Sequence, residues 1–434
     1  MGMLTVEEAL SRCLSTDLPR RTEVLPLSEA DGRLLAEDLH APSPLPRWDN
    51  SAMDGFAIRH ADCTPHPDTT AQPGCELSTP SEQPPATARL RTLGTIAAGD
   101  MPDTAVMPGT TLRIMTGAPL PAGADTVVMR ENVTDADGVA IIHGMPRQGQ
   151  HIRRAGEEVA LGQLAVPAGT ELTPPVIGLC ASMGLSEVTV AARPRVALLG
   201  TGDELVPPGQ PLEPGQIYSS NSLALAAMVR QAGGEPIDCG IAPDTLEGTR
   251  AAFQRALDTG CDLILSTGGV SVGDFDVVKD ALTDVGAEMV FWKVRVKPGK
   301  PLAMGMIGDR PAFGLPGNPV SCMVNFLQFV RPLIRRAVGD PRPFLPAVPA
   351  TLRGNIRKRH GRAELVRVVL SWSESGLIAE TTGGQSSGWI SSMARADGLL
   401  LLGIDSEGAA DGDAVTVQII RPGFLSAERP QYPW

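Results

Sequence analysis

The clearest pattern of apolar positions lies in the second half of the chain. The run RVALLG at 195–200 is continuously apolar, as expected of a strand that is buried on both faces. A pattern with helical spacing follows at 222–234 and ends in two glycines, and the next apolar run lies at 236–242. A second helical pattern at 246–260 and a strand at 262–267 repeat this alternation. Strands that alternate with helices predict an open, mostly parallel α/β sheet.

The alternation continues toward the last quarter of the chain. A helical pattern at 275–286 is followed by two extended runs, VFWKVRV and PLAMGM, within 290–306. The strand AFGL at 312–315 then leads into a helix. We expect Asn318 to be the N-cap of that helix and Pro319 its first residue, since these residue types favour these positions.

The flanking regions have a different texture. At the N-terminus, Thr5-x-x-Glu8 is a capping box ahead of apolar residues at helical spacing, which predicts a helix. From about 22 to 185 the apolar runs are short and broken by glycine and proline, as in β-rich domains. After about 345 alternation returns, with turns between the runs, and predicts a small all-β domain. The predicted fold class is α/β plus β, in several domains.

Composition narrows the possible functions. The 434 residues exceed the roughly 250–300 that one core holds, which favours about three domains. Lys and Arg number 37 against 49 Asp and Glu, so the net charge of −12 lacks the basic footprint of a nucleic-acid binder. No apolar run reaches the roughly 18 residues of a membrane span, and the N-terminus lacks the pattern of a secretory signal. We therefore expect a cytoplasmic protein without nucleic-acid or membrane partners.

Cysteines and histidines do not indicate a zinc site. The seven cysteines are scattered and form no CxxC, and the six histidines include no close pair at ligand spacing. An odd number of scattered cysteines also does not favour a disulfide framework.

Candidate chemistry gathers where the predicted strands end. In open α/β sheets, ligands bind in the crevice at the carboxyl ends of the strands. Glycines, carboxylates and lysines follow the strands at 200–204, at Asp244, at 267–273 with Asp274 and Asp276, at 297–301 and at 314–321. Any one of these segments could be an ordinary turn. Because all of these segments are expected at the same edge of the sheet, together they favour a ligand-binding site.

The residue types at this edge indicate a class of ligand. Glycines let the backbone approach a ligand closely and offer N–H groups to phosphate. Lysines neutralise oxyanions, and clustered carboxylates suit a divalent metal that bridges phosphate oxygens. The combination favours a phosphorylated or nucleotide-like ligand bound with a hard metal.

A rival interpretation rests on the segment at 269–273. Its sequence GVSVG is a literal G-x-S-x-G between a strand and a helix, the pattern of a nucleophilic serine in α/β hydrolases. A triad would need a histidine later in the chain, and His360 in the β-rich region is the only one. We therefore favour Ser271 as a hydroxyl donor to a phosphate.

Several motifs together resemble one family. They are DNSAMDGFA at 49–57, RIMTGA at 113–118, IRR with GEE at 152–158, TGDEL at 201–205, TGGVSVG at 267–273, KPGKP at 297–301 and PGNPVS at 316–321. In this order they resemble the molybdopterin molybdenumtransferases, the bacterial counterparts of the gephyrin E domain. The resemblance extends from about residue 5 to 420.

The resemblance implies an architecture and a reaction. The subunit would have an α/β molybdopterin-binding domain (1–21 and 193–344), a linking domain (22–40 and 163–192), a small β domain (41–162) and a C-terminal β-barrel (345–434). The family forms homodimers and inserts molybdenum from molybdate into the dithiolene of adenylylated molybdopterin, which releases AMP. It requires a divalent cation, usually Mg²⁺. The resemblance also implies handover from the upstream adenylylating protein and to downstream molybdoenzymes.

The resemblance also implies roles for individual residues. The residues that would bind the pterin and nucleotide are Thr201, Asp203, Asn221, Asp244, Gly268, Gly269, Ser271, Asn318, Pro319 and Ser321, with Arg153 and Glu158 from the small β domain. Asp276, Asp54, Thr116 and Glu204 would be catalytic. The metal ligands would be drawn from Asp203, Glu204, Asp244 and Asp276. Molybdate would be bound by Lys297, Lys300, Arg362 and Ser387.

Some positions depart from the family pattern. Ala155 stands where relatives often have a third arginine, so an anion clamp would rest on Arg153 and Arg154. Val277 stands where an aromatic residue is common, which could loosen one wall of the pocket. Ser386 aligns almost as well as Ser387 with the barrel motif. The alternative function is a paralogue that binds molybdopterin or molybdate without catalysing insertion.

Overall fold

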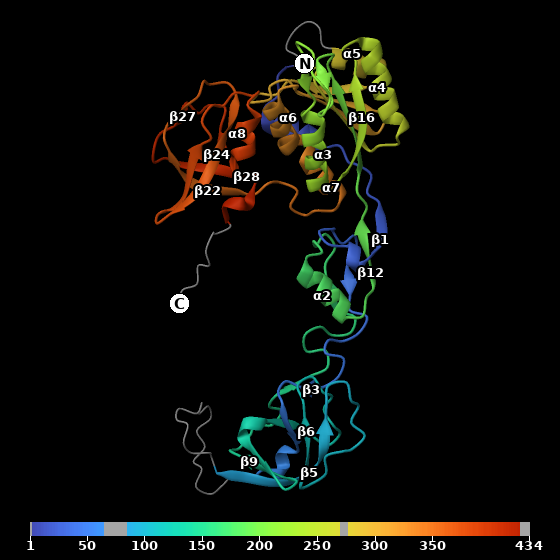
Figure 1. The fold of residues 1–434 in the computed structure, drawn as a ribbon, viewed down its shortest axis with the longest axis vertical. Coiled ribbons are helices and arrows are strands. Elements are labelled where there is room, and N and C mark those ends of the chain that lie inside the picture. Colours follow the sequence, from blue (N-terminus) through green and yellow to red (C-terminus); the bar gives the residue numbers. More distant parts are fainter. Residues whose placement is uncertain (1, 65–84, 270–276, 426–434) are drawn as a thin grey trace.

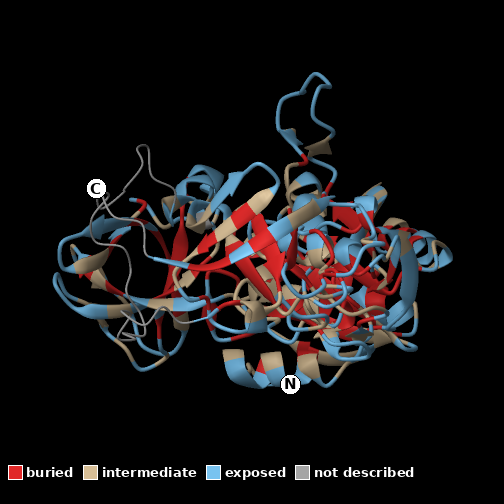
Figure 2. Cartoon of the chain, turned by 90° about the horizontal axis from the view of Figure 1, so that it is seen from below, coloured by how far each residue is buried: buried red, intermediate tan, exposed pale blue. Residues whose placement is uncertain are grey.

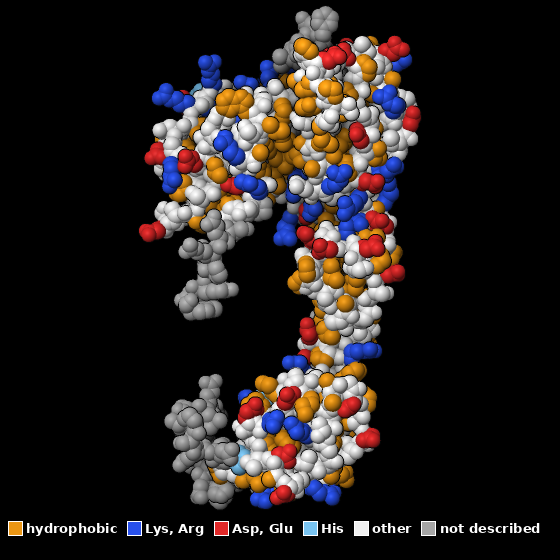
Figure 3. Space-filling view, viewed as in Figure 1, with side chains coloured by type: hydrophobic (Ala, Val, Ile, Leu, Met, Phe, Trp, Pro, Cys, Tyr) orange, Lys and Arg blue, Asp and Glu red, His pale blue; other side chains and the backbone are white. Residues whose placement is uncertain are grey.

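The structure is a computed structural model of the chain, and it describes residues 2–64, 85–269 and 277–425. Figure 1 shows an elongated molecule in which an α/β lobe and a C-terminal β lobe lie at one end. A β-sheet from the first third of the chain lies at the opposite end, and a narrow segment joins the two ends (Figure 1 and Figure 3). The predicted fold class, α/β plus β in several domains, is confirmed.

The α/β lobe is built on one six-stranded sheet. Its strand order is β16 (Glu235–Ala242), β13 (Arg195–Thr201), β17 (Leu263–Thr267), β21 (Arg310–Leu315), β20 (Ala303–Ile307) and β18 (Glu288–Trp292). The first four strands are parallel, and β20 and β18 continue the sheet in antiparallel pairing. This confirms the predicted mostly parallel sheet.

Both faces of this sheet are buried, as the continuous apolar run in β13 predicts. Val196 and Leu198 belong to one hydrophobic cluster, whereas Ala197 and Leu199 belong to another, since successive strand residues point to opposite faces. Figure 2 shows the buried residues concentrated inside the lobes. The first cluster includes residues of α1 (Val6–Leu14), α3 (Asn221–Gln231) and α6 (Pro319–Asn325), and the second includes residues of α4 (Leu246–Asp258) and α5 (Val277–Asp284).

The predicted capping box at the start of α1 is confirmed. The Glu8 N–H donates to Thr5 Oγ1 at 3.2 Å, and the Thr5 N–H donates to Glu8 Oε2 at 2.8 Å. Ala9 and Cys13 are fully buried against the sheet of the second half of the chain. The α/β lobe is therefore assembled from two separated stretches of chain.

The helix after β21 begins as predicted but is capped differently. Asn318 occupies the N-cap position and Pro319 is the first helical residue, yet the Asn318 side chain makes no capping hydrogen bond. Helix α6 continues through a π-helical turn at Phe326–Val330 into α7 (Arg331–Ala337). The Asn318 amide is thus left to face the site described below.

The narrow connecting segment has its own small core. Strand β1 (Thr22–Pro26) pairs with β12 (Glu187–Ala191), and β2 (Leu39–His40) pairs with β11 (Leu164–Val166). Residues of these strands pack in one hydrophobic cluster with Cys180 of α2 (Pro174–Ser182).

The sheet at the far end has six strands and a short ribbon beside it. Their order is β7 (Thr126–Met129), β4 (Gly55–Ile58), β6 (Thr110–Ile114), β5 (Ala86–Ile96), β9 (Val139–His143) and β8 (Val133–Ala136). The ribbon pairs β3 (Asn50–Ser51) with β10 (Ile152–Arg153), which brings together two motifs about 100 residues apart in the sequence.

The C-terminal lobe is a closed five-stranded barrel. Its strands are β24 (Ala363–Ser373), β25 (Gly376–Thr381), β22 (Ala347–Arg353), β28 (Ala414–Ile419) and β26 (Gly398–Leu402), and β26 pairs back to β24. This confirms the barrel that the resemblance implies. The short helix α8 (Ile390–Arg395) was not predicted by the alternating pattern. Strand β19 (Val296–Lys297) pairs with β24 and thereby joins the barrel to the α/β lobe.

No helix in residues 2–64, 85–269 and 277–425 is long and apolar enough to cross a membrane.

Candidate functional site

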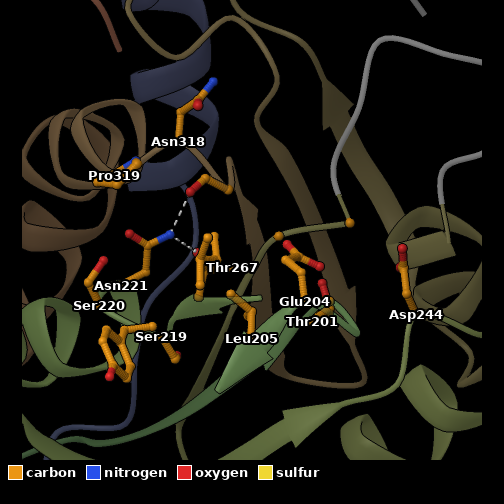
Figure 4. A pocket seen from close by; sticks show the side chains of 16 residues that line it. Thr201, Glu204, Leu205, Ser219, Ser220, Asn221, Asp244, Thr267, Asn318 and Pro319 are labelled. Atoms are coloured by element: carbon orange, nitrogen blue, oxygen red, sulfur yellow. Dashed lines mark hydrogen bonds between the residues drawn. The ribbon is translucent and has the colours of Figure 1, made fainter. Parts of the chain in front are cut away.

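A pocket of about 720 Å³ opens at the carboxyl ends of β13, β17 and β21 (Figure 4). The first residues of helices α3 and α6 form its opposite wall. The lining residues are Thr201, Gly202, Glu204, Leu205, Ile217, Tyr218, Ser219, Ser220, Asn221, Asp244, Thr267, Gly268, Gly269, Gly317, Asn318 and Pro319. The pocket therefore lies where ligands bind in open α/β sheets.

One wall of the pocket is shaped by glycine. Gly268 has a φ of +94°, and a Cβ atom there would lie 2.3 Å from the backbone oxygen of Thr201. Gly269 has a φ of +64° and would place a Cβ 2.9 Å from Thr201 Oγ1. Only glycine fits these two positions, because a side chain would be both strained and in collision.

Thr201 brings an unsatisfied hydroxyl to this wall. The residue is 2% exposed, and its Oγ1 has no hydrogen-bond partner among the residues that the structure describes. An unpaired buried hydroxyl is costly unless something satisfies it. A ligand in the pocket would supply the missing partner.

Carboxylates border the same pocket. Glu204 and Asp244 line it, whereas Asp203 is not among the lining residues; the Asp203 Oδ1 accepts the Asp244 N–H at 3.1 Å. Within the described ranges no group of three or more Asp, Glu, His or Cys side chains could hold a metal ion. Mg²⁺ in phosphate sites needs only one or two protein carboxylates beside the substrate oxygens, so Glu204 and Asp244 fit that role.

Asn221 links two of the strand ends. Its Nδ2 donates to Thr267 Oγ1 at 2.8 Å and to the backbone oxygen of Gly317 at 2.7 Å. These two bonds fix the tips of β17 and β21 relative to the first turn of α3 (Figure 4).

The barrel contacts the first turn of α6, which also forms part of the pocket wall. The Val320 N–H of α6 donates to the backbone oxygen of Ser387 at 3.1 Å. The residues just before Ser387 are held by the fully buried Arg367 of β24. Its guanidinium donates to the carbonyl oxygens of Gly384 and Ser386 at 3.4 and 3.2 Å. Burial lowers the pKa of the Arg367 guanidinium, and the nearby Glu364 counteracts this.

A second, basic pocket of about 290 Å³ lies between β19 and the barrel. It is lined by Lys297, Arg357, Lys358, Arg359, Arg362 and Glu364. Lys297 Nζ is 2.6 Å from Glu364 Oε1, and Lys358 Nζ donates to the carbonyl oxygens of Ile404 and Ser406. In the described part of the chain, Arg357, Arg359 and Arg362 have no acidic partner within ion-pair distance. The pocket is thus equipped for an anion.

The small β-sheet carries a separate polar cluster. Asp54 Oδ1 accepts the Thr116 N–H at 2.7 Å and the Thr116 hydroxyl at 2.8 Å. These two hydrogen bonds lower the pKa of Asp54, with the backbone N–H as the larger cause. Arg154 pairs with Asp49 at 2.5 Å, and the Ala155 N–H donates to the same carboxylate at 2.8 Å.

Comparisons with known proteins bear on the whole chain. Residues 4–184 match the MoeA N-terminal region (domain I and II), 197–336 a probable molybdopterin binding domain, and 349–420 the MoeA C-terminal region (domain IV). The molybdopterin molybdenumtransferase of Haemophilus influenzae is 36% identical over 423 residues, which cover 96% of this chain and 98% of the relative. The chain belongs to the molybdopterin molybdenumtransferase family.

Further relatives agree with this membership. Molybdopterin molybdenumtransferase 2 of Mycobacterium tuberculosis is 38% identical over 405 residues, covering 92% of this chain and 95% of the relative. The crystal structure of the molybdopterin biosynthesis MoeA protein from Pyrococcus horikoshii superimposes with a TM-score of 0.81 at 30% identity, covering 96% of this chain and 99% of that one. The names of these relatives identify the family as transferases of molybdenum cofactor biosynthesis.

The structure brings together many of the predicted pocket residues of this molybdenumtransferase family member. Those that line the pocket are Thr201, Glu204, Asn221, Asp244, Gly268, Gly269, Asn318 and Pro319. Ser321 is buried in α6 and does not line it. Ser271, Asp274 and Asp276 lie outside the described residues, as does the side chain of Val277.

The other predicted residues of this family member fall into separate places. Lys297 and Arg362 share the basic pocket, whereas Lys300 and Ser387 do not line it. Ser387 instead meets α6 through its backbone. Asp54, Thr116, Arg153 and Glu158 belong to the small β-sheet and its surrounding loops, at the far end of the molecule from the pocket (Figure 1). Arg154 pairs with Asp49, and the clamp of Arg153 and Arg154 stays a prediction.

Sequence reasoning missed one side of the pocket. Ile217 and Tyr218 form the short strand β15, which pairs with β14 (Leu205–Val206), and Ser219 and Ser220 lead into α3. Two-residue strands leave no periodic signal. Sequence reasoning also missed Arg357, Lys358 and Arg359, whose only signal is a basic run.

Proposed function

We propose that this chain inserts molybdenum from molybdate into the dithiolene of adenylylated molybdopterin and releases AMP. The observation that carries this proposal is the pocket at the carboxyl ends of β13, β17 and β21. Its glycine wall and the unsatisfied hydroxyl of Thr201 suit a ligand that brings phosphate oxygens close to the backbone. Membership of the family supports molybdopterin as the core of that ligand.

Residues around the pocket would divide the work. The backbone at Gly268 and Gly269 and the Thr201 hydroxyl would hold the phosphates, and Asn318 and Pro319 would close the pocket from the side of α6. Glu204 and Asp244 would hold Mg²⁺, which when bound offsets negative charge on the phosphoanhydride. Ser271 and Asp276 stay predicted participants in this pocket.

The basic pocket is the proposed place of molybdate. A tetrahedral dianion needs several cationic donors, and Lys297 and Arg362 lie here with Arg357 and Arg359. Lys297 is oriented by Glu364, which is 7% exposed and bonds its ammonium group at 2.6 Å. Lys300 and Ser387 remain proposed contributors from the adjoining loops.

The polar cluster of the small β-sheet would act in a second subunit. Asp54 and Thr116 lie at the end of the molecule opposite the pocket, so one chain does not bring the two together (Figure 1). A homodimer, as the family resemblance implies, would place this cluster over the partner's pocket. Asp54 is a charged acceptor near neutral pH, and because the hydrogen bonds that lower its pKa also make it a weaker base, it would orient a proton-bearing group rather than take up its proton.

The direct experiment is AMP release from adenylylated molybdopterin, with and without molybdate and Mg²⁺. We expect release to depend on both and the pterin product to contain molybdenum. Tight binding of the pterin without AMP release under any metal would instead indicate the non-catalytic paralogue.

A further inference from the structure

The orientation of the Asn221 amide is fixed by its surroundings. Two acceptors, Thr267 Oγ1 and the Gly317 carbonyl oxygen, lie 2.8 and 2.7 Å from Nδ2. A backbone carbonyl oxygen can only accept hydrogen bonds. Turning the amide over would place Oδ1 against the Gly317 oxygen at hydrogen-bond distance, which is repulsive. The chemistry of the neighbours therefore determines which end of the amide is the NH₂ group.

The remaining atom of the amide is available to a ligand. Figure 4 shows Asn221 Oδ1 pointing away from Thr267, toward the space between Ser220 and Pro319. All three of these side chains line the pocket, and the residue is half-buried. Among the described residues no donor bonds to Oδ1. Asn221 thus offers the ligand an acceptor and no donor.

We infer that Asn221 selects a heterocycle bearing an exocyclic amino group, and that the ring end of the substrate binds on the α3 side of the pocket. A phosphate oxygen at this point would meet another oxygen, whereas an amino N–H would satisfy Oδ1. Tyr218 lines the same side and is 46% exposed, which leaves a planar side chain beside the expected ring. The inference rests on the proposed function, since adenylylated molybdopterin carries such an amino group on both its pterin and its adenine.

The assay measures binding of matched ring pairs to the full chain by isothermal titration. One pair is AMP and 6-methylpurine ribonucleoside monophosphate, and the other is 6-hydroxymethylpterin and its analogue with methyl in place of the 2-amino group. Methyl and amino groups are close in size, so each pair differs chiefly in the donor. Losing one hydrogen bond and leaving Oδ1 unpaired should weaken binding about tenfold in the pair whose ring contacts Asn221.

Three variants assign the discrimination to this amide. Asn221→Leu removes the acceptor and should bring the affinity ratio of the sensitive pair close to one. Thr267→Val removes one of the two groups that orient the amide, and should give an intermediate ratio even if the leucine variant does not fold. Ser222→Ala alters a hydroxyl in the same turn of α3 that does not line the pocket, and should leave the ratio as in the wild type.

The outcomes separate this inference from the proposed function. Equal affinities within both pairs for the wild type, or an unchanged ratio in both Asn221→Leu and Thr267→Val, would overturn the role of Asn221 while leaving the pocket as the substrate site. Absence of binding by AMP and by the pterin alike would overturn both the inference and the proposed use of this pocket. The pair that discriminates identifies which ring lies against α3.

Discussion

The backbone N–H of Val320 donates to the backbone oxygen of Ser387, and this 3.1 Å bond joins the first turn of α6 to a loop of the barrel. The Ser387 loop is itself held from behind by Arg367, a fully buried residue of β24. Because Asn318 and Pro319 at the start of α6 line the pocket, the barrel and the pocket wall are linked through one short path.

Replacing Arg367 with methionine should loosen this link. The carbonyl oxygens of Gly384 and Ser386 would lose their buried donor, at a cost of about 1–3 kcal/mol. We expect a lower thermal midpoint and faster hydrogen exchange at the Val320 amide, measured by mass spectrometry. Arg353→Met is the matched control, because Arg353 and Glu380 are both largely exposed, 3.7 Å apart. Unchanged exchange at Val320 in Arg367→Met would contradict the link.

Thr116→Val should raise the pKa of Asp54 toward that of an ordinary aspartate. The variant removes the hydroxyl donor and keeps the backbone N–H, so the shift is partial. Because the folded-state pKa is depressed, this contact stabilises the fold above the ordinary Asp pKa and is lost as the pH falls through the folded value. The acid limb of AMP release should accordingly move to higher pH.

Carbon NMR of the Asp54 carboxyl measures this change directly. Thr104→Val is the control, since its hydroxyl bonds to Asp103 and not to Asp54. An Asp54 titration that is the same in Thr116→Val and in the wild type would rule out the assigned cause of the lowered pKa.

Asn325→Leu should weaken binding of molybdate and leave pterin binding unchanged. Asn325 is fully buried, and its Nδ2 donates to the oxygens of Gly299 and Pro301 at 3.0 and 3.4 Å, which holds the KPGKP backbone on both sides of Lys300. Without these bonds the loop loses its fixed position, and we expect the apparent KM for molybdate to rise about tenfold.

The matched control for the loop is Gln328→Leu. Gln328 lies in the same helical run but bonds to Gln418 of the barrel at 2.6 Å, away from the loop. A rise in KM of equal size in both variants would assign the effect to the helix as a whole, and no rise in Asn325→Leu would remove the role of this residue.

Local and topological rules account for what the sequence predicts correctly. The Thr5 and Glu8 capping box depends on residues three apart, so it is visible in the sequence. The pocket residues at the ends of β13, β17 and β21 follow from one rule about parallel sheets, without any knowledge of side-chain packing. Family motifs then extend these expectations to individual residues.

The remainder depends on contacts between distant segments. Asn318 looks like a helix cap in sequence, but its side chain makes no cap bond, because the start of α6 instead meets the barrel loop at Ser387. Arg154 looks free, but β3 and β10 place it beside Asp49. Tyr218 belongs to a two-residue strand, too short for any periodic pattern. Rules based on neighbouring residues cannot predict such contacts. The orientation of the Asn221 amide likewise depends on Thr267 and Gly317, which are distant in the sequence.

Gly268→Ala tests whether the glycine wall forms the ligand site. An alanine Cβ would lie 2.3 Å from the backbone oxygen of Thr201, which cannot move without shifting β13, so we expect AMP affinity to fall more than tenfold in equilibrium binding. Gly286→Ala is the control: its φ of +85° imposes a similar strain of about 1–3 kcal/mol, but nothing lies within 4 Å of the added carbon. If both alanine variants lost affinity equally, backbone strain in the lobe would explain the loss. If Gly268→Ala bound AMP with the affinity of the wild type, the phosphates would have to lie elsewhere in the pocket.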